Sequence, residues 1–331
     1  MAKGRSNTRP TEDDELVARA AWLHFVGGLT QGEVATRLGI SATRAHRAIS
    51  KAQASGIVQI VVKATAATCV ELENKLSDAF GLTMCRVAMD LPERGPIPLK
   101  SLGAAGGEWL DQVIASKAHE VIGISHGRTI AAMVEHLGQG HKTNAVFVSL
   151  LGGLTRSLAA NPYDVIHRLA LKTGADAYLM PVPLFANSAK DREVMMAQSM
   201  LTEAFARMRS ATLAIVGIGD LSASTGANVA DGQGLNKAKD LKDCGAAAEI
   251  LGQFIDHDGA KISTPLDGRA MALDLDDLSG REVVAVAGGA EKVGPIRAAL
   301  KSGLLTGLII DEATARVLVD GLEGKDTLAA E

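Results

Sequence analysis

The chain of 331 residues has few aromatic side chains, few cysteines and no long apolar run. Aromatic residues make up only 3%, so we expect few stacking platforms for bases or sugar rings. Cys69, Cys85 and Cys244 are odd in number and widely separated, which excludes a disulfide framework and fits a reducing cytoplasm. No segment has the apolar length of a membrane span, and residues 1–15 lack the apolar core of a signal peptide. We therefore expect a cytoplasmic protein with no membrane partner.

Nucleotide-binding and metal-binding patterns are also missing. The glycine-containing loops of the chain follow neither the G-x-G-x-x-G fingerprint nor the P-loop pattern, which argues against NAD and nucleoside triphosphates, and we expect no cofactor. His119, His136, His141 and His167 have no partner at ligand spacing, so we expect no metal site. The D-H-D-G stretch at 256–259 fits a solvated turn better than a metal cluster.

The composition and the distribution of charge suggest separate parts. Apolar residues make up 47% and charged residues 22%, as in a soluble protein with a sizeable core. Residues 1–60 contain eight Lys and Arg against five Asp and Glu, a net charge of +3, and the remainder carries −7. A basic head on an acidic body indicates that the head alone meets a polyanion. We expect a disordered arm at 1–11, a small basic domain at 12–62, and a larger acidic domain at 63–331.

The most specific pattern is LTQGEVATRLGISATRAHRAISK at residues 29–51. Thr30 can cap a short helix, Gly39 can supply the left-handed residue of a turn, and Ser41 can cap a second helix. The inward-facing residues of these two helices should be Val34, Ala35, Leu38, Ala45, Ala48 and Ile49. This spacing is typical of a helix-turn-helix whose second helix enters the major groove.

Two flanking elements complete the predicted head. A preceding helix from Asp13 to Gly27 is indicated by apolar residues at helical spacing, namely Leu16, Ala20, Leu23 and Val26. After Gly56, the apolar residues 57–62 predict a strand that leads into the body or belongs to a small wing.

The DNA-binding face should lie on the outer side of the second helix. Arg44 and Arg47 could read guanine edges, whereas Lys51 suits a phosphate and His46 could contact either. The alternative is a structural helical hairpin with a solvated charged face, on which His46 is merely exposed. The residues that we expect at the DNA are Thr30, Gln31, Ser41, Thr43, Arg44, His46, Arg47, Ser50 and Lys51.

The body alternates helices with short, continuously apolar strands, which predicts a Rossmann-like α/β domain with a mostly parallel sheet covered on both faces. The predicted strands are 83–90, 119–125, 144–154, 175–185, 212–219, 281–289 and 306–312. In such folds, ligands bind beyond the carboxyl ends of the strands.

Four strand ends carry the unusual residues of the body. The stretch SHGRT at 125–129 opens a helix whose N-terminal N–H groups favour an anion. Leu-Gly-Gly-Leu at 151–154, Gly-Ile-Gly-Asp at 217–220 and Gly-Gly-Ala-Glu-Lys at 288–292 lie at the carboxyl ends of three other strands. Each alone is explained by ordinary turn chemistry, but four at one sheet edge predict a site for a polyol or a sugar phosphate. Glu249 could accept hydrogen bonds from sugar hydroxyls or be a surface helix charge.

The chain resembles the SorC family of bacterial sugar-responsive transcriptional regulators, close to the DeoR-like regulators of sugar catabolism. The resemblance rests on AWLHFVGGLTQGEVATRLGIS in the head and on IGISHGRTIAA, SLLGGL, AAAEILGQFIDHDG and VVAVAGGAEKVGPIRAALKSGLLTGLIIDEATARVLV in the body. It implies an effector domain similar in fold to glucosamine-6-phosphate deaminase and ribose-5-phosphate isomerase, without their activity. It also implies a dimer or tetramer that binds operators near sugar-uptake or sugar-catabolic operons.

The resemblance also implies roles for individual residues. The phosphate or polyol cradle would be Gly127, Arg128 and Thr129 with Gly152 and Gly153, and Glu249 and Lys292 would contact the rest of the ligand near Asp220. The expected effector-binding set is Ser125, His126, Gly127, Arg128, Thr129, Gly152, Gly153, Asp220, Glu249 and Lys292. The chain departs from the family's pattern at His126, where a smaller or aromatic residue is expected, and at Ala45, where a larger apolar residue is common.

Three functions are compatible with these features. We favour a ligand-responsive transcription factor whose operator affinity is controlled by a sugar phosphate or a sugar alcohol. A second reading is a sugar-phosphate isomerase or deaminase with an added DNA-binding head, for which Glu249 or Asp220 would be the base. A third is a DNA-binding protein whose body only oligomerises.

Overall fold

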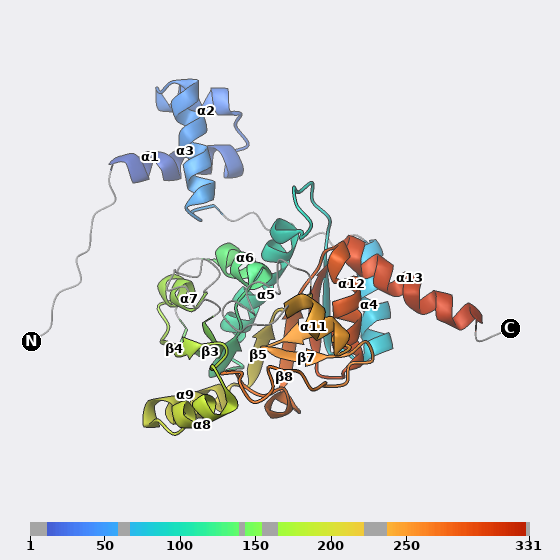
Figure 1. Cartoon of the computed structure of the whole chain (residues 1–331). Helices are drawn as coiled ribbons and strands as arrows, with labels where there is room; N and C mark the ends of the chain where they lie inside the picture. The colour runs from blue at the N-terminus through green and yellow to red at the C-terminus, as the bar shows by residue number, and fades with distance from the viewer. Residues whose placement is uncertain (1–11, 59–66, 139–142, 154–164, 222–236, 329–331) are drawn as a thin grey trace, which may run out of the picture. The chain divides into compact units, whose positions relative to one another are not determined.

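The computed structural model describes residues 12–58, 67–138, 143–153, 165–221 and 237–328 (Figure 1). The predicted arm at 1–11 and most of the predicted strand at 57–62 lie outside these ranges. The chain divides into two compact units, residues 1–64 and 65–331, and each is described by itself.

Over residues 12–58, the first unit consists of α1 (Glu12–Ala21), a π-helical turn η1 (Trp22–Val26), α2 (Gln31–Leu38) and α3 (Ala42–Ala54). Its small core consists of Val17, Ala20, Ala21, Val34, Ala35, Ala45, Ala48, Ile49 and Ala52. The predicted buried faces of α2 and α3 are confirmed, except that Leu38 is only partly buried.

The predicted turn chemistry between these helices is present. Thr30 and Glu33 form a capping box, in which the Thr30 N–H donates to Glu33 Oε2 at 2.8 Å and the Glu33 N–H donates to Thr30 Oγ1 at 3.4 Å. Gly39 has a φ of 65°, a conformation in which a side chain is strained. Ser41 Oγ accepts a hydrogen bond from the Arg44 N–H at 3.2 Å and so caps α3.

The preceding helix differs from its prediction. Regular α-helix ends at Ala21, and the wider π turn is closed by the Gly27 N–H, which donates to the Trp22 carbonyl at 2.9 Å. A wider turn rotates the following side chains around the axis, and the expected inward residue Val26 is 70% exposed.

The second unit is built on a seven-stranded sheet with the order β1-β9-β8-β5-β2-β3-β4, in which every adjacent pair is parallel. The strands are β1 (Met84–Ala88), β2 (Val121–Ile124), β3 (Val146–Gly153), β4 (Ala177–Pro183), β5 (Leu213–Val216), β8 (Glu282–Val286) and β9 (Gly307–Asp311). All seven predicted strands and the predicted α/β class are confirmed.

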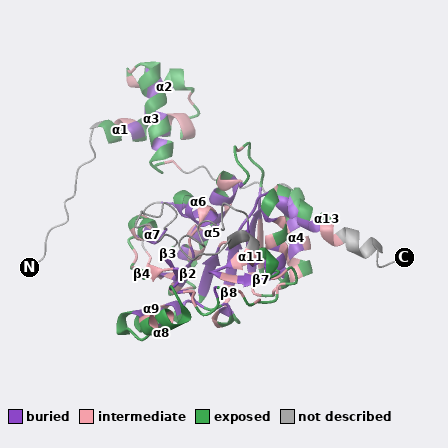
Figure 2. Ribbon diagram, viewed as in Figure 1, coloured by how far each residue is buried: buried purple, intermediate pink, exposed green. Residues whose placement is uncertain are grey.

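Helices cover both faces of this sheet, and Figure 2 shows most of the strand residues buried between them. Along β8, Val284 and Val286 belong to one apolar cluster, whereas Val283 and Ala285 belong to the other. Helices on the first face are α5 (Leu99–Ser116), α6 (Arg128–His136) and α7 (Ile166–Thr173). Those on the second are α4 (Ala67–Phe80), α9 (Ser199–Ser210), α11 (Lys237–Asp243), α12 (Val293–Lys301) and α13 (Glu312–Leu328).

Two further parts of the body bear on the site. Between β4 and β5 the chain forms two helices, α8 (Ala189–Met196) and α9, which are separated where Gln198 is extended with a ψ of 131°. Residues 248–255 form an antiparallel hairpin of β6 (Ala248–Ile250) and β7 (Gln253–Ile255). Glu249 lies in a strand, so the alternative reading of this residue as a surface helix charge is wrong. The sequence did not indicate the two strands because strands of three residues show no usable periodicity.

Candidate functional site

The outer face of α3 is exposed over the positions predicted to meet DNA. Its exposed residues are Thr43, Arg44, His46, Arg47, Ser50 and Lys51. On the opposite face, Ala45 is fully buried, and its short side chain lets α3 pack closely within the unit. The helix therefore separates a small-residue packing face from a polar and basic face.

The remaining side-chain contacts divide the predicted DNA-binding residues into two groups. Thr30 and Ser41 cap their helices, and Lys51 Nζ lies 2.7 Å from Asp13 Oδ2, which raises the pKa of Lys51 through the hydrogen bond. Within the described ranges, the guanidinium groups of Arg44 and Arg47 make no hydrogen bond or ion pair. Arg44 and Arg47 thus present their guanidinium groups on the exposed face of α3.

In the second unit, the hydroxyl groups of the SHGRT stretch hold strands together. Ser125 Oγ accepts a hydrogen bond from the Gly217 N–H at 3.0 Å, which ties the end of β2 to the end of β5. Thr129 Oγ1 donates to the Val286 carbonyl at 2.7 Å, which ties the first turn of α6 to β8. Both hydroxyls are buried, so we assign these residues to positioning the site more than to contacting a ligand.

His126 and the two glycines at the end of β3 form a second structural connection. His126 Nε2 lies 2.9 Å from the carbonyl oxygen of Gly152, and the Gly152 N–H donates to the Met271 carbonyl at 2.8 Å. A Cβ atom at Gly152 would collide with the Val182 and Pro183 carbonyls. The N–H of Gly152 is thus committed within the fold, whereas exposed Gly153 has room around it.

The start of α6 is open. Gly127 occupies the N-cap position with a φ of 138°, and an added Cβ would meet nothing within 4 Å. No side chain caps the helix there, so the N–H groups of its first turn, which lack intrahelical acceptors, remain available to an anion.

Three buried or half-buried charged side chains complete the site. Lys292 is 9% exposed in the 3₁₀ turn η3 (Ala290–Lys292), and its Nζ donates to the Ile218 carbonyl at 2.5 Å. Asp220, 7% exposed, follows β5 by four residues. Glu249 reaches the same edge through the hairpin, where its backbone pairs with Gly219 through hydrogen bonds of 2.8 and 3.1 Å.

The charges of these groups act on one another. Burial lowers the pKa of Lys292, Asp220 and Glu249 oppose this shift, and the Arg128 charge adds to it. Burial also raises the pKa of Glu249; the Gly252 N–H and Lys292 oppose that shift, and Asp220 adds to it. Two cations and two carboxylates therefore meet where β2, β5, β8 and the hairpin converge, which suits a ligand rich in groups that both donate and accept hydrogen bonds.

One buried carboxylate at this edge was not among the residues predicted from the sequence. Asp311, 2% exposed at the end of β9, accepts hydrogen bonds from the Gly289 N–H at 3.0 Å, the Thr314 N–H at 2.9 Å and Thr314 Oγ1 at 2.8 Å. Gly289 has a φ of 104°. Asp311 thereby fixes the loop that carries Lys292. A carboxylate that ends an apolar strand, LIID, was the available signal.

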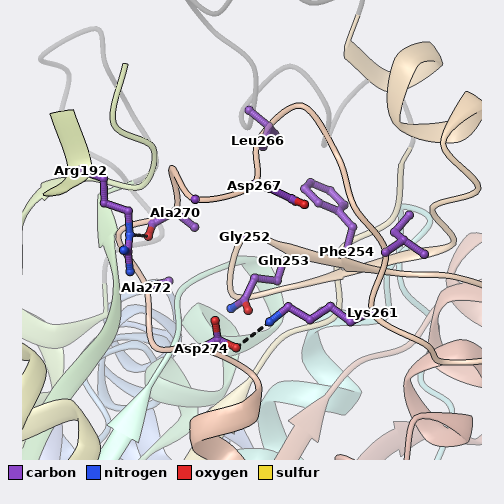
Figure 3. A pocket seen from close by; sticks show the side chains of 12 residues that line it. Arg192, Gly252, Gln253, Phe254, Lys261, Leu266, Asp267, Ala270, Ala272 and Asp274 are labelled. Carbon is purple, nitrogen blue, oxygen red and sulfur yellow. Dashed lines mark hydrogen bonds and ion pairs between the residues drawn. The ribbon is translucent and has the colours of Figure 1, made fainter. Parts of the chain in front are cut away.

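A pocket of about 300 Å³ is lined in part by residues of the β6–β7 hairpin (Figure 3). Lys261 Nζ pairs with Asp274 at 2.7 Å across it, and Arg192 Nε donates to the Ala270 carbonyl at 2.8 Å. The predicted effector residues do not line this pocket. Gly252 borders the pocket, and its N–H donates to Glu249 Oε1. This glycine therefore links the pocket to the predicted effector-binding residues.

Metal-binding and membrane-spanning features were sought in the described ranges. No group of three or more His, Cys, Asp and Glu side chains there could hold a metal ion. None of the helices described has the length and apolar character needed to cross a membrane.

Comparison with known proteins gives matches along both units. Residues 64–320 match the sugar-binding domain family (Sugar-bind), and residues 27–59 match a winged helix-turn-helix DNA-binding family. The erythritol catabolism regulatory protein EryD of Brucella abortus is 47% identical over 95% of this chain and 99% of its own. The transcriptional regulator LsrR of an Enterobacter species is 28% identical over 93% of both chains. The crystal structure of the full-length sorbitol operon regulator SorC from Klebsiella pneumoniae has a TM-score of 0.69 and 26% identity, covering 93% of this chain and all of its own.

Proposed function

The chain belongs to the SorC family of sugar-binding transcriptional regulators, and from that premise we propose that it controls an operon for the uptake or catabolism of a small polyol. Regulators of this kind, and not enzymes, are its named relatives. The first unit would bind operator DNA, and the second unit would bind an effector that changes the affinity of the protein for that DNA.

The exposed face of α3 supports the DNA-binding half of the proposal. Arg44 and Arg47 present guanidinium groups that can donate two hydrogen bonds to a guanine edge. Gly39 and the Ser41 cap shape the turn between α2 and α3, and the Thr30 capping box secures the start of α2. We assign Thr43, Ser50 and Gln31 to the same interface.

The observation that carries the effector half is Lys292, buried beside Asp220 and Glu249 at the carboxyl ends of the strands. A polyol offers vicinal hydroxyl groups, each of which can donate to a carboxylate and accept from an ammonium or a helix N–H. The balanced charge of the cluster favours an uncharged ligand. The 47% identical relative, named for erythritol catabolism, makes a four-carbon polyol our first candidate.

A phosphorylated polyol is the second candidate, because the positive charge of Arg128 and the uncapped start of α6 both favour an anion. Isothermal titration of the full-length protein with erythritol, xylitol and sorbitol, and with a phosphate ester of each, decides between them. Binding of the polyols alone supports the first candidate, and binding of the esters alone supports the second. No heat of binding from any of the six compounds would remove the effector proposal.

We also propose that two or more copies of the chain assemble, so that their DNA-binding units engage the half-sites of one operator. An effector that stabilises one arrangement of the assembly would then change operator affinity by a coupling free energy of typically 1–3 kcal/mol. Sedimentation velocity of the purified protein tests the assembly, and a monomer at micromolar concentration would contradict it.

A further inference from the structure

Two exposed side chains of the DNA-binding unit meet across the angle between its helices. Gln31 is the first residue of α2, and His46 lies on the exposed face of α3, the helices shown crossing in Figure 1. Their side chains approach with His46 Nδ1 3.2 Å from Gln31 Oε1. This contact constrains both the position of the imidazole ring and which of its nitrogens carries a proton.

The contact determines which imidazole nitrogen carries a proton. An amide oxygen can only accept a hydrogen bond, so His46 Nδ1 must be the donor. A neutral imidazole has a single N–H, and its other nitrogen, Nε2, is then an acceptor. We propose that Gln31 sets His46 as a hydrogen-bond acceptor on the DNA-reading face, and that His46 selects a base with an exocyclic amino group at one operator position.

The major groove makes this selection possible. Adenine presents its N6 amino group and cytosine its N4 amino group, whereas guanine and thymine present acceptor atoms, O6 and N7 or O4. An acceptor nitrogen pairs with the first two bases and faces the lone pairs of the other two. His46 thus differs in kind from the neighbouring Arg44 and Arg47, whose guanidinium groups only donate and suit guanine. The inference rests on the proposed DNA binding by this face.

The surrounding structure holds the pair in place. Gln31 directly follows Thr30, whose capping box with Glu33 fixes the start of α2. On α3, Ala45 directly before His46 and Ala48 two positions after it are buried, which sets the rotation of the helix. The acceptor is therefore oriented before DNA binds, which lowers the entropy cost of base recognition.

The test is selection of bound sequences from a duplex library with a randomised central region, using the full-length protein. The wild-type chain should enrich sites in which one position prefers adenine or cytosine over guanine or thymine on the order of tenfold. His46→Ala should remove the preference at that position alone. The matched control Gln53→Ala, which removes another exposed amide on α3, should leave it unchanged.

A second variant tests the tautomer itself. In Gln31→Glu the carboxylate favours a doubly protonated imidazole, so that Nε2 becomes a donor and the preference should move toward guanine or thymine. An unchanged preference in His46→Ala, or in Gln31→Glu, would overturn the inference while leaving DNA binding by the unit intact. Enrichment of no sequence by the wild-type chain would overturn the proposed function, and this inference with it.

Discussion

Replacing Lys292 by methionine tests the effector site with little change in side-chain volume. The substitution removes the ammonium group that lies beside Asp220 and Glu249 and keeps an unbranched apolar stem. It also removes the hydrogen bond from Nζ to the Ile218 carbonyl. We expect the polyol to lose its effect on operator affinity while the fold persists.

The expected magnitudes follow from the buried position of this group. The lost charge-assisted hydrogen bond costs roughly 1.5–3 kcal/mol of folding free energy. The removed ammonium no longer has to be desolvated, which offsets part of this cost, but Asp220 and Glu249 lose a neighbouring positive charge. The free energy of unfolding should therefore fall by up to about 3–5 kcal/mol, the usual cost of removing one partner of a buried charge pair. The coupling between effector and operator, about 1–3 kcal/mol and thus 5-fold to 150-fold in affinity, should fall to nearly one-fold.

Fluorescence anisotropy of a labelled operator duplex, with and without polyol, measures the coupling, and urea unfolding measures the stability. Lys301→Met is the matched control, because Lys301 lies exposed at the end of α12 and pairs with Asp258 at 2.8 Å. It should keep the full response to polyol. A Lys292→Met protein that folds and still responds as the wild type does would refute the assignment of Lys292 to the effector site.

Three further predictions concern the DNA-binding face and the buried carboxyl groups. Arg44→Ala and Arg47→Ala should each weaken specific operator binding by about 1–3 kcal/mol in an anisotropy titration, with the sedimentation coefficient unchanged; equal loss on unrelated DNA would argue against base reading. Asp311→Ala should lower the free energy of unfolding by roughly 2–3 kcal/mol, because the Thr314 N–H and hydroxyl lose their acceptor, whereas the Gly289 N–H keeps Thr314 Oγ1. Exposed Asp320→Ala should cost less than about 0.5 kcal/mol, and equal effects of the two would contradict a positioning role. Burial raises the pKa of Glu249, so the folded state favours the protonated carboxyl group. The contribution of this group to the free energy of unfolding is fully present below the ordinary pKa of 4.5 and is lost as the pH rises through the folded-state pKa. Glu249→Gln should remove this loss and stabilise the fold by about 1 kcal/mol at pH 7.5, and a less stable variant at that pH would show that the ionised form is the favoured one.

Sequence patterns predicted the DNA-binding unit and the sheet because their signals are local. The Thr30 and Ser41 caps and the left-handed Gly39 lie within twelve residues of one another, and each constrains only its own turn. The apolar strands were likewise evident one at a time. The π turn after Ala21 was not, because the spacing of apolar residues does not distinguish it from a continuing α-helix.

The details of the effector site were less predictable because they depend on distant partners. Thr129 bonds to Val286 across 157 positions of the chain, and Ser125 bonds to Gly217 across 92. A loop sequence cannot show that such hydroxyl groups are already committed to the fold. Glu249 required knowledge of the hairpin, and Asp311 required the position of the Lys292 loop beside β9.

The central claim is that a polyol bound in the second unit controls how tightly the first unit holds its operator. Its most direct measurement is the dissociation constant of the full-length protein for the duplex upstream of the operon that it regulates, determined with and without saturating erythritol. The account predicts a change of 5-fold to 150-fold that Lys292→Met abolishes and Lys301→Met retains. Identical dissociation constants with and without erythritol, when titration shows that erythritol binds, would contradict it.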